Sequence, residues 1–172
     1  NSLSRSELGL PETGFVFCCF NNNYKITNST FSGWMRILKV VKDSVLWLFE
    51  NNSMSAKNLK KEALKHGIND NRLIFAAQMP VEEHLNRIKL ADLFLDTLPY
   101  NAHTTSSDSL RMNVPVLTCI GQSFASRVAA SIVNAVNLPE LITHSQEEYE
   151  SLAIELATNP DKLKAIKEKL AS

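Results

Sequence analysis

Short apolar runs alternate along this chain with longer segments in which apolar residues recur every three or four positions. Five runs have the length and composition of buried strands, over residues 14–20, 44–49, 72–76, 93–96 and 114–119. The other segments have helical spacing, over residues 29–42, 55–67, 81–91, 104–112, 123–136, 145–158 and 161–171. Strands that are apolar throughout and separated by helices indicate a parallel sheet covered on both faces. We therefore expect a doubly wound α/β fold, with a single domain spanning residues 1–172.

Composition narrows the classes of partner. The chain has 172 residues, and its 18 basic side chains balance 18 acidic ones. No charge excess favours nucleic acid or an anionic membrane as a partner. No apolar stretch reaches the roughly 20 residues of a membrane span, and the first ten residues lack the apolar centre of a secretion signal. We expect a cytoplasmic protein, and the short segment before the first strand suggests a fragment of a longer one.

Three cysteines add little chemistry. Cys18 and Cys19 are adjacent in one apolar run and Cys119 lies in another. This spacing fits neither a disulfide framework nor a zinc site, so we interpret them as buried, reduced thiols.

Candidate chemistry should lie in the loops that follow the strands, because doubly wound sheets bind ligands beyond the carboxyl ends of their strands. The loop after the first run contains three asparagines and Lys25. Asparagines favour a turn. Lys25 is either an ordinary solvated lysine or a cation that neutralises a diphosphate.

The helix predicted over residues 81–91 carries a second candidate pair. Val81, Leu85 and Ile88 share its apolar face. His84 lies at the flank of that face, and Arg87 lies one step further round. This spacing predicts a half-buried His84 and an Arg87 at the rim. His84 is either a core histidine with satisfied hydrogen bonds or a ring that stacks on a base, with Arg87 near phosphate.

A cluster of hydroxyl groups follows the fourth run. His103 is followed by Thr104 and Thr105, then by two serines and Asp108. Thr105 and Asp108 have the spacing of a capping box, which would explain two of these residues structurally. The alternative is a phosphate site, formed by the hydroxyls, the imidazole and the N–H groups of a helix start, with Asp108 accepting from a ribose. Neither a G-x-G-x-x-G motif nor a P-loop is present.

Three stretches together resemble a known family. They are FNNNYKI, EEHLNRIKLADLFLDTLPYNAHTTSSDSL and VPVLTCIGQSFASRVAAS, and the resemblance extends from about Gly9 to the end of the chain. The chain resembles the carboxyl-terminal catalytic half of the O-linked N-acetylglucosamine transferases that follow tetratricopeptide repeats, and their bacterial relatives. This implies the C-terminal, Rossmann-like half of a GT-B glycosyltransferase, which holds the UDP part of the sugar donor.

The resemblance also implies roles for individual residues. Lys25 matches the lysine that contacts the diphosphate and carries the catalytic role. The implied donor-binding residues are Asn22, Met79 (through its backbone, to uracil), His84 (packed on uracil), Arg87 (base and ribose), His103, Thr104 and Thr105 (phosphates) and Asp108 (ribose hydroxyls).

Three positions depart from the family pattern. Asn22 stands where many relatives have a longer Gln, and Val81 stands where some have a Lys that reaches the nucleotide. One polar contact to the donor is therefore expected to be missing. Asn113 replaces a Gly before the fifth strand, and we expect it to adopt the left-handed conformation that asparagine tolerates.

The implied activity is transfer of a sugar, N-acetylglucosamine, from UDP to a Ser or Thr hydroxyl of a protein, with inversion and without a metal or other cofactor. The sequence agrees in lacking a D-x-D pair for a divalent ion. The implied partners are the UDP-sugar, the protein acceptor, and an amino-terminal catalytic half with repeats, which are not in this sequence. The chain alone is expected to be inactive. The alternative is a nucleotide-binding or protein-interaction module that has lost transfer activity.

Overall fold

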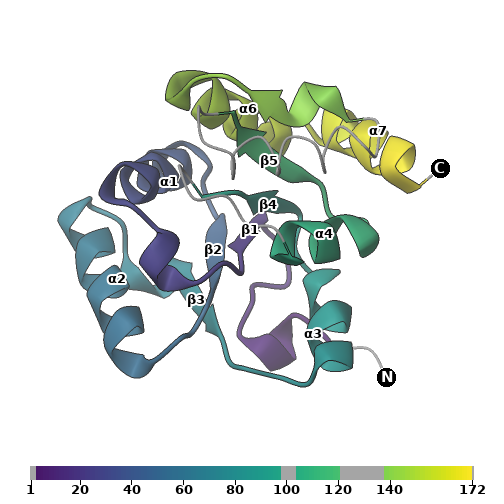
Figure 1. Cartoon of the computed structure of the whole chain (residues 1–172). Helices are drawn as coiled ribbons and strands as arrows, with labels where there is room; N and C mark the ends of the chain where they lie inside the picture. Colours follow the sequence, from purple (N-terminus) through teal and green to yellow (C-terminus); the bar gives the residue numbers. More distant parts are fainter. Residues whose placement is uncertain (1–2, 98–103, 121–137, 172) are drawn as a thin grey trace.

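The six strands among the described residues form one sheet in the order β3-β2-β1-β4-β5-β6, and every neighbouring pair is parallel (Figure 1). The computed structural model describes residues 3–97, 104–120 and 138–171. The strands are β1 (Val16–Cys19), β2 (Val45–Phe49), β3 (Leu73–Ala76), β4 (Leu93–Leu95), β5 (Val116–Cys119) and β6 (Ile142–Thr143). The predicted parallel α/β sheet is thus confirmed.

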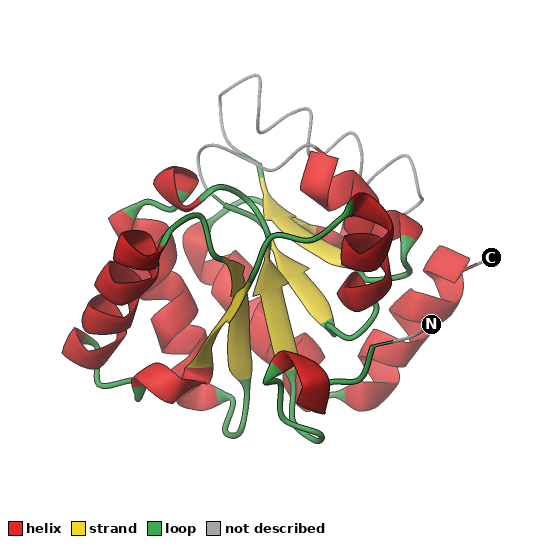
Figure 2. Cartoon of the chain, turned by 90° about the horizontal axis from the view of Figure 1, so that it is seen from below, coloured by secondary structure: helices red, strands yellow, loops and turns green. Residues whose placement is uncertain are grey.

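Helices cover both faces of the sheet (Figure 2). Their bounds are α1 (Asn28–Val40), α2 (Ser53–Lys65), α3 (Val81–Ile88), α4 (Thr104–Arg111), α6 (Gln146–Thr158) and α7 (Pro160–Ala171). Helices α3 and α4 pack together on one face, whereas α1 and α6 pack together on the other, with α7 beside α6 (Figure 1). Four 3-10 turns complete the described elements: η1 (Ser6–Leu8), η2 (Asn23–Lys25), η3 (Asp70–Arg72) and η4 (Pro139–Leu141).

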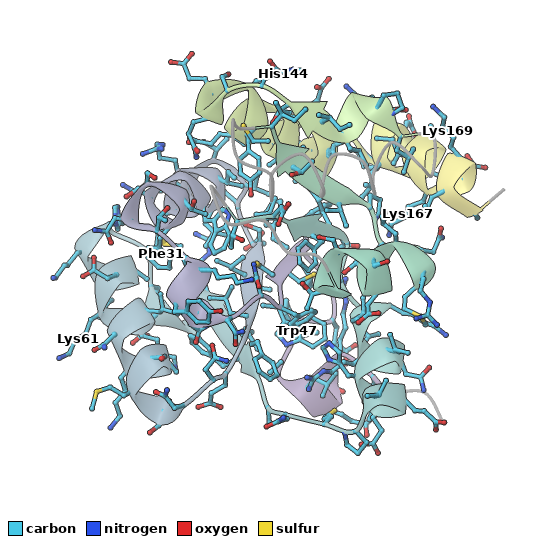
Figure 3. All side chains as sticks on the ribbon, viewed as in Figure 1. Phe31, Trp47, Lys61, His144, Lys167 and Lys169 are labelled. Atoms are coloured by element: carbon cyan, nitrogen blue, oxygen red, sulfur yellow. The ribbon has the colours of Figure 1, made fainter. Side chains whose placement is uncertain are left out.

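The apolar runs form strands because both of their faces are covered. All residues of β1, β4 and β5 are buried. Figure 3 shows Trp47 of β2 inside the molecule, whereas Lys61 points outward from α2. The thiols of Cys18, Cys19 and Cys119 are buried and free, as expected, and burial raises the pKa of all three.

The elements differ from the sequence predictions mainly at their ends. Each described helix starts or stops within a few residues of its predicted bounds. Strand β6 and the 3-10 turns were not predicted, because segments of two or three residues carry no measurable periodicity. The helix predicted over residues 123–136 lies outside the described residues.

The order of the strands locates the ligand-binding edge. The chain proceeds outward from β1 to β2 and β3, then returns to place β4 on the other side of β1. Sheets with this order bind ligands where it reverses, at the carboxyl ends of the two strands concerned. We therefore expect the candidate site just beyond the carboxyl ends of β1 and β4, a region that we call the crevice. Among the described residues, no helix is long and apolar enough to cross a membrane.

Candidate functional site

Residues from helix α3 and the end of strand β1 form an aromatic and basic cluster beside this crevice. Phe20 directly follows β1, and its ring contacts His84 of α3 edge to face, with centroids 5.2 Å apart. The guanidinium of Arg87 lies over the same ring, 6.0 Å from its centroid. Arg87 Nε donates a hydrogen bond to His84 Nδ1 at 3.0 Å. Since Nδ1 accepts, the neutral imidazole must carry its proton on Nε2.

The electrostatics of this cluster favour a neutral His84. The pKa of its half-buried side chain is lowered, first by burial and then by the neighbouring Arg87 charge, while Asp108 of α4 acts in the opposite direction. The α3 and α4 residues are therefore close enough to influence each other's charge. A neutral ring can stack on a base and still donate from Nε2.

Arg87 is more deeply buried than the sequence predicted. It is only 1% exposed, so the expectation that it lies at the rim is wrong. The helical wheel places it beside the apolar stripe, but Phe20, which lies outside that helix, covers it. Its Nη2 is buried without a hydrogen-bond partner among the described residues. A buried cation with an unsatisfied donor is costly, and a ligand that accepts from it would remove that cost.

Helix α4 presents a second unsatisfied group at the same edge. The helix already begins at Thr104, so Thr105 is inside it and is not its N-cap. The Thr105 hydroxyl is buried and has no hydrogen-bond partner among the described residues. The capping-box interpretation of Thr105 and Asp108 is therefore wrong. His103 lies outside the described residues, and nothing is described of the Thr104 side chain.

Asp108 is half-buried on α4, which packs against α3, and its charge opposes the lowering of the pKa of His84. Its carboxylate lies 3.7 Å from Arg111, an exposed partner one turn along the helix. Such exposed pairs are weak, so the carboxylate remains available to accept from another donor.

The loop after β1 is a 3-10 turn that ends at Lys25. Lys25 is half-buried. The turn is fixed to the loop after β2, because Asn51 Oδ1 accepts from the main-chain N–H of Asn23 at 2.6 Å. Asn51 Nδ2 also donates to Asn22 Oδ1 at 2.9 Å. The shorter side chain at position 22 is thus held by the neighbouring loop.

The remaining predicted positions lie around this edge or confirm a local expectation. Met79 is half-buried between β3 and α3. Val81, the first residue of α3, is 73% exposed, so its expected place on the buried apolar face of this helix is wrong. Asn113 has φ 67°, as expected for its left-handed position.

Sequence reasoning missed a buried polar network at the ends of the central strands. Asn21 Nδ2 donates to Thr97 Oγ1 at 2.8 Å. The Asp96 carboxylate accepts from the Thr97 main-chain N–H at 2.9 Å and from the Thr118 hydroxyl at 2.8 Å. The available signal was the abrupt change from an apolar run to polar residues at Asn21 and at Asp96. Only the strand order shows that the two changes meet.

Two hollows lie elsewhere, at the amino ends of the strands. One, of about 590 Å³, lies under α7 and is lined by Phe15 and Lys167, and the other, of about 790 Å³, is lined by Leu10 and Arg72. Both are at the edge opposite the crevice, so neither belongs to the candidate site. Within the described ranges, no group of three potential metal ligands comes together.

Comparison with known proteins identifies the family. The sequence profile of glycosyl transferase family 41 matches residues 2–172. The chain belongs to this family. Among curated family 41 relatives, a UDP-N-acetylglucosamine–peptide N-acetylglucosaminyltransferase of Caenorhabditis elegans is 38% identical over 97% of this chain. A probable enzyme of the same description from Arabidopsis thaliana, SEC, is 39% identical over 96% of it. The chain spans only 14% and 17% of the lengths of these relatives.

Solved structures agree with the family 41 assignment. A mutant O-GlcNAc transferase of Thermobaculum terrenum matches 92% of this chain with a TM-score of 0.88 and 31% identity, over 31% of its own chain. A putative UDP-N-acetylglucosamine 2-epimerase of Listeria monocytogenes matches 97% of this chain and 40% of its own, with a TM-score of 0.60 and 14% identity. That second likeness concerns the fold alone. The fold of this family 41 chain is that of the Rossmann-like domains of GT-B glycosyltransferases.

Proposed function

We propose that this chain is the donor-binding half of an inverting, metal-independent glycosyltransferase that moves N-acetylglucosamine from UDP to a Ser or Thr hydroxyl of a protein. Membership of family 41 supports the class of reaction, and two relatives carry names that state this donor and a peptide acceptor. The proposal includes an acceptor-binding half and tetratricopeptide repeats outside this sequence.

The observation that carries the proposal is the pair of unsatisfied buried groups at the crevice. The Nη2 of Arg87 and the hydroxyl of Thr105 come from two adjacent helices, and neither has a hydrogen-bond partner among the described residues. Native proteins rarely leave such groups unsatisfied unless a ligand or water completes them. A nucleotide supplies acceptors for both, and the neutral ring of His84 supplies a surface for its base.

In this proposal each residue has a defined task. His84 packs on the uracil, Met79 contacts it through the backbone, and Arg87 donates to the base or ribose. Asp108 accepts from the ribose hydroxyls. On the side of the leaving group, Lys25 is the catalytic cation that meets the charge developing on UDP.

Helix α4 shares this electrostatic task. The N–H groups at its start point toward an anion, and the hydroxyl of Thr105 adds a donor within the first turn. By the family resemblance, His103, Thr104 and Asn22 are assigned to the same donor. Donors fixed before the reaction stabilise a developing charge without the cost of reorganisation, which makes a metal ion unnecessary in principle.

The test is an NMR titration of the chain with UDP, UDP-N-acetylglucosamine and UDP-glucose. We expect amide and side-chain shifts at His84 and Asp108, with the same UDP affinity in EDTA and in magnesium. Arg87→Met should weaken UDP binding by about tenfold or more, because hydrogen bonds from a charged donor are lost. Arg36→Met is the matched control, since Arg36 is an exposed arginine that pairs with Glu150 of α6.

Several results would contradict the proposal. If His84 and Asp108 show no chemical-shift changes, the donor does not bind at these residues. If both arginine substitutions weaken UDP binding equally, Arg87 has no specific role in it. A requirement for magnesium would contradict metal independence while leaving nucleotide binding intact.

A further inference from the structure

A buried hydrogen-bond network ties the two strands that flank the crevice. Asn21 follows β1 and Thr97 follows β4, and their side chains are joined at 2.8 Å although 76 residues separate them in sequence. Both residues are buried. This contact therefore spans the point where the strand order reverses, in a place that water does not reach.

Both ends of the Asn21 amide are used. Its Nδ2 donates to Thr97, and its Oδ1 accepts from the main-chain N–H of Asn22 at 3.0 Å. Asn22 is the residue from which the 3-10 turn carrying Lys25 starts. The position of Thr97 is thus transmitted through one amide group to the start of the turn that presents Lys25.

Thr97 is itself held by Asp96, whose carboxylate is fully buried. One carboxylate oxygen accepts from the Thr97 N–H and the other from the Thr118 hydroxyl of β5. The Asp96 main-chain oxygen accepts from the Tyr149 hydroxyl at 2.7 Å, and that hydroxyl accepts from Trp34 Nε1 at 3.0 Å. Helices α1 and α6 therefore fix the end of β4 from the opposite face of the sheet.

Burying polar groups in such a network costs free energy, which a complete set of hydrogen bonds is needed to offset. Burying a carboxylate costs several kcal/mol, which its hydrogen bonds must offset. Apolar residues would end these strands at lower cost. What the polar network adds is direction, because each hydrogen bond fixes a distance and an angle between elements that otherwise meet only through packing.

We propose that Asn21, Asp96 and Thr97 are positioning residues that set the spacing between the Lys25 turn and the carboxyl end of β4, and so the fit of the diphosphate at this edge of the sheet. The inference rests on the proposed function, since it names the network that holds that site in place. None of the three residues has to touch the nucleotide. If the Lys25 turn moved relative to the end of β4, the diphosphate could no longer contact groups on both of them at their best distances.

The experiment compares Thr97→Val with Thr97→Ser in the chain, using NMR titration with UDP and with uridine. Valine keeps the shape of threonine and removes the acceptor for Asn21, whereas serine keeps the hydroxyl. We expect Thr97→Val to weaken UDP binding about three- to tenfold, the effect of one buried hydrogen bond, and to leave uridine affinity within about twofold. Thr97→Ser should restore UDP affinity to within about twofold of the original chain.

The matched control is Thr143→Val in β6. The Thr143 hydroxyl is also buried and donates to the Thr118 main-chain oxygen at 2.9 Å, but it lies away from the crevice. This substitution should lower stability without changing the affinity for UDP. Asn21→Ala removes the Thr97 contact from the other side. The loss in the double variant should be smaller than the sum of the two single losses, because both substitutions remove the Asn21–Thr97 hydrogen bond, and Asn21→Ala alone also removes the acceptor of the Asn22 N–H.

The outcomes separate the two proposals. If the unaltered chain does not bind UDP, the proposed function fails and takes the positioning role with it. If the unaltered chain binds UDP and Thr97→Val binds it equally well, or loses uridine affinity to the same degree, the positioning role alone is overturned. Should Thr97→Val not fold, Asn21→Ala decides by the same two ligands.

Discussion

His84 combines two properties at the scale of a single residue: it is half-buried, and its Nδ1 already accepts from Arg87. A proton arriving at low pH would have to displace that hydrogen bond and place a second positive charge beside the guanidinium. The folded state therefore disfavours protonation of this ring, so the free energy of unfolding depends on pH through His84.

The free energy of unfolding should decrease as the pH falls through the histidine range. The pKa of His84 is below its usual 6.5 in the folded chain, so the unfolded chain takes up a proton first as the pH is lowered. The contribution of His84 is constant above its unfolded pKa and turns against folding below it. Urea unfolding followed from about pH 7.5 to 5.5 should show this decrease, and His84→Gln should make it shallower.

Gln is a suitable replacement because its amide oxygen can still accept from Arg87 Nε. As a second check, Arg87→Met should move the pKa of His84 upward, since it removes one of the two causes of the shift. NMR titration of the ring would show this directly. An unchanged slope in His84→Gln would exclude His84 as the source of the pH dependence.

The sequence predicted that His84 and Arg87 are neighbours and that His84 is half-buried, but it did not predict the burial of Arg87. The three-residue spacing of His84 and Arg87 on a helix was enough to place them together. The ring that covers them, Phe20, is more than sixty positions earlier in the chain. Spacing along one helix contains no information about such a neighbour, so Arg87 was wrongly expected at the rim.

The end of helix α1 depends on a single arginine from a distant element. Arg72, at the end of η3, donates through Nη2 to the main-chain oxygens of Leu38 at 2.6 Å and Val41 at 3.0 Å. Its Nε donates to the main-chain oxygen of Ser44 at 3.0 Å. The last carbonyls of a helix have no partner within it, so this side chain satisfies groups that α1 cannot.

Arg72→Met should therefore lower the free energy of unfolding by about 2 to 3 kcal/mol, because the main-chain oxygens of Leu38 and Ser44 lose this donor, whereas that of Val41 keeps the Ser44 hydroxyl. Arg72→Lys should recover only part of this loss, since one ammonium group cannot replace the planar fork. Urea unfolding with a constant m-value would measure both. Lys39→Met, at an exposed position in the last turn of α1, is the control and should change stability little.

UDP affinity gives this prediction a second readout. Arg72 lies at the amino edge of the sheet, opposite the crevice, so the folded fraction of Arg72→Met should bind UDP as the original chain does. A loss below about 0.5 kcal/mol would show that water satisfies these carbonyls equally well.

Strands β1 to β5 were predictable because burial on both faces imposes a continuous apolar run, and the helices were predictable from the spacing of their apolar residues. The start of α4 was harder. Thr105 and Asp108 matched a capping pattern, but the helix begins one residue before Thr105. Its hydroxyl is therefore no cap but a buried donor with no partner in the part of the chain that the structure describes. A shift of one residue at a helix start thus decides between a structural and a ligand-binding interpretation.

The whole molecule shows why the positioning network could not be predicted. Asn21 and Thr97 belong to strands that are neighbours only because the chain returns across β1 after completing β3. Alternation of strands and helices predicts a parallel sheet, but it does not specify the order of the strands. The polar residues at the two strand ends were visible in the sequence, whereas their contact is a property of the topology.

The share of its relatives that this chain spans bears on the activity expected of the chain alone. It spans 14% and 17% of two relatives named as peptide N-acetylglucosaminyltransferases. Transfer requires donor and acceptor to be held together in a reactive geometry, and bringing them together supplies a large part of the rate. All the residues proposed here hold the donor side. We therefore expect the 172-residue chain to bind UDP and to transfer no sugar.

The measurement is mass spectrometry of a serine-containing peptide incubated with UDP-N-acetylglucosamine and the chain, using a preparation whose UDP binding has first been confirmed by NMR. Binding without product is the expected result, since Lys25 can stabilise a departing UDP only when a nucleophile is held at the sugar. Glycosylated peptide above the enzyme-free blank would mean that the acceptor site lies within these residues. Binding is also expected of a module that has lost transfer activity, so a longer polypeptide containing this chain must be assayed in parallel. If that polypeptide forms product, and Lys25→Ala abolishes or strongly reduces it, this chain is the donor half of an active enzyme. If it forms no product, this chain is a nucleotide-binding module.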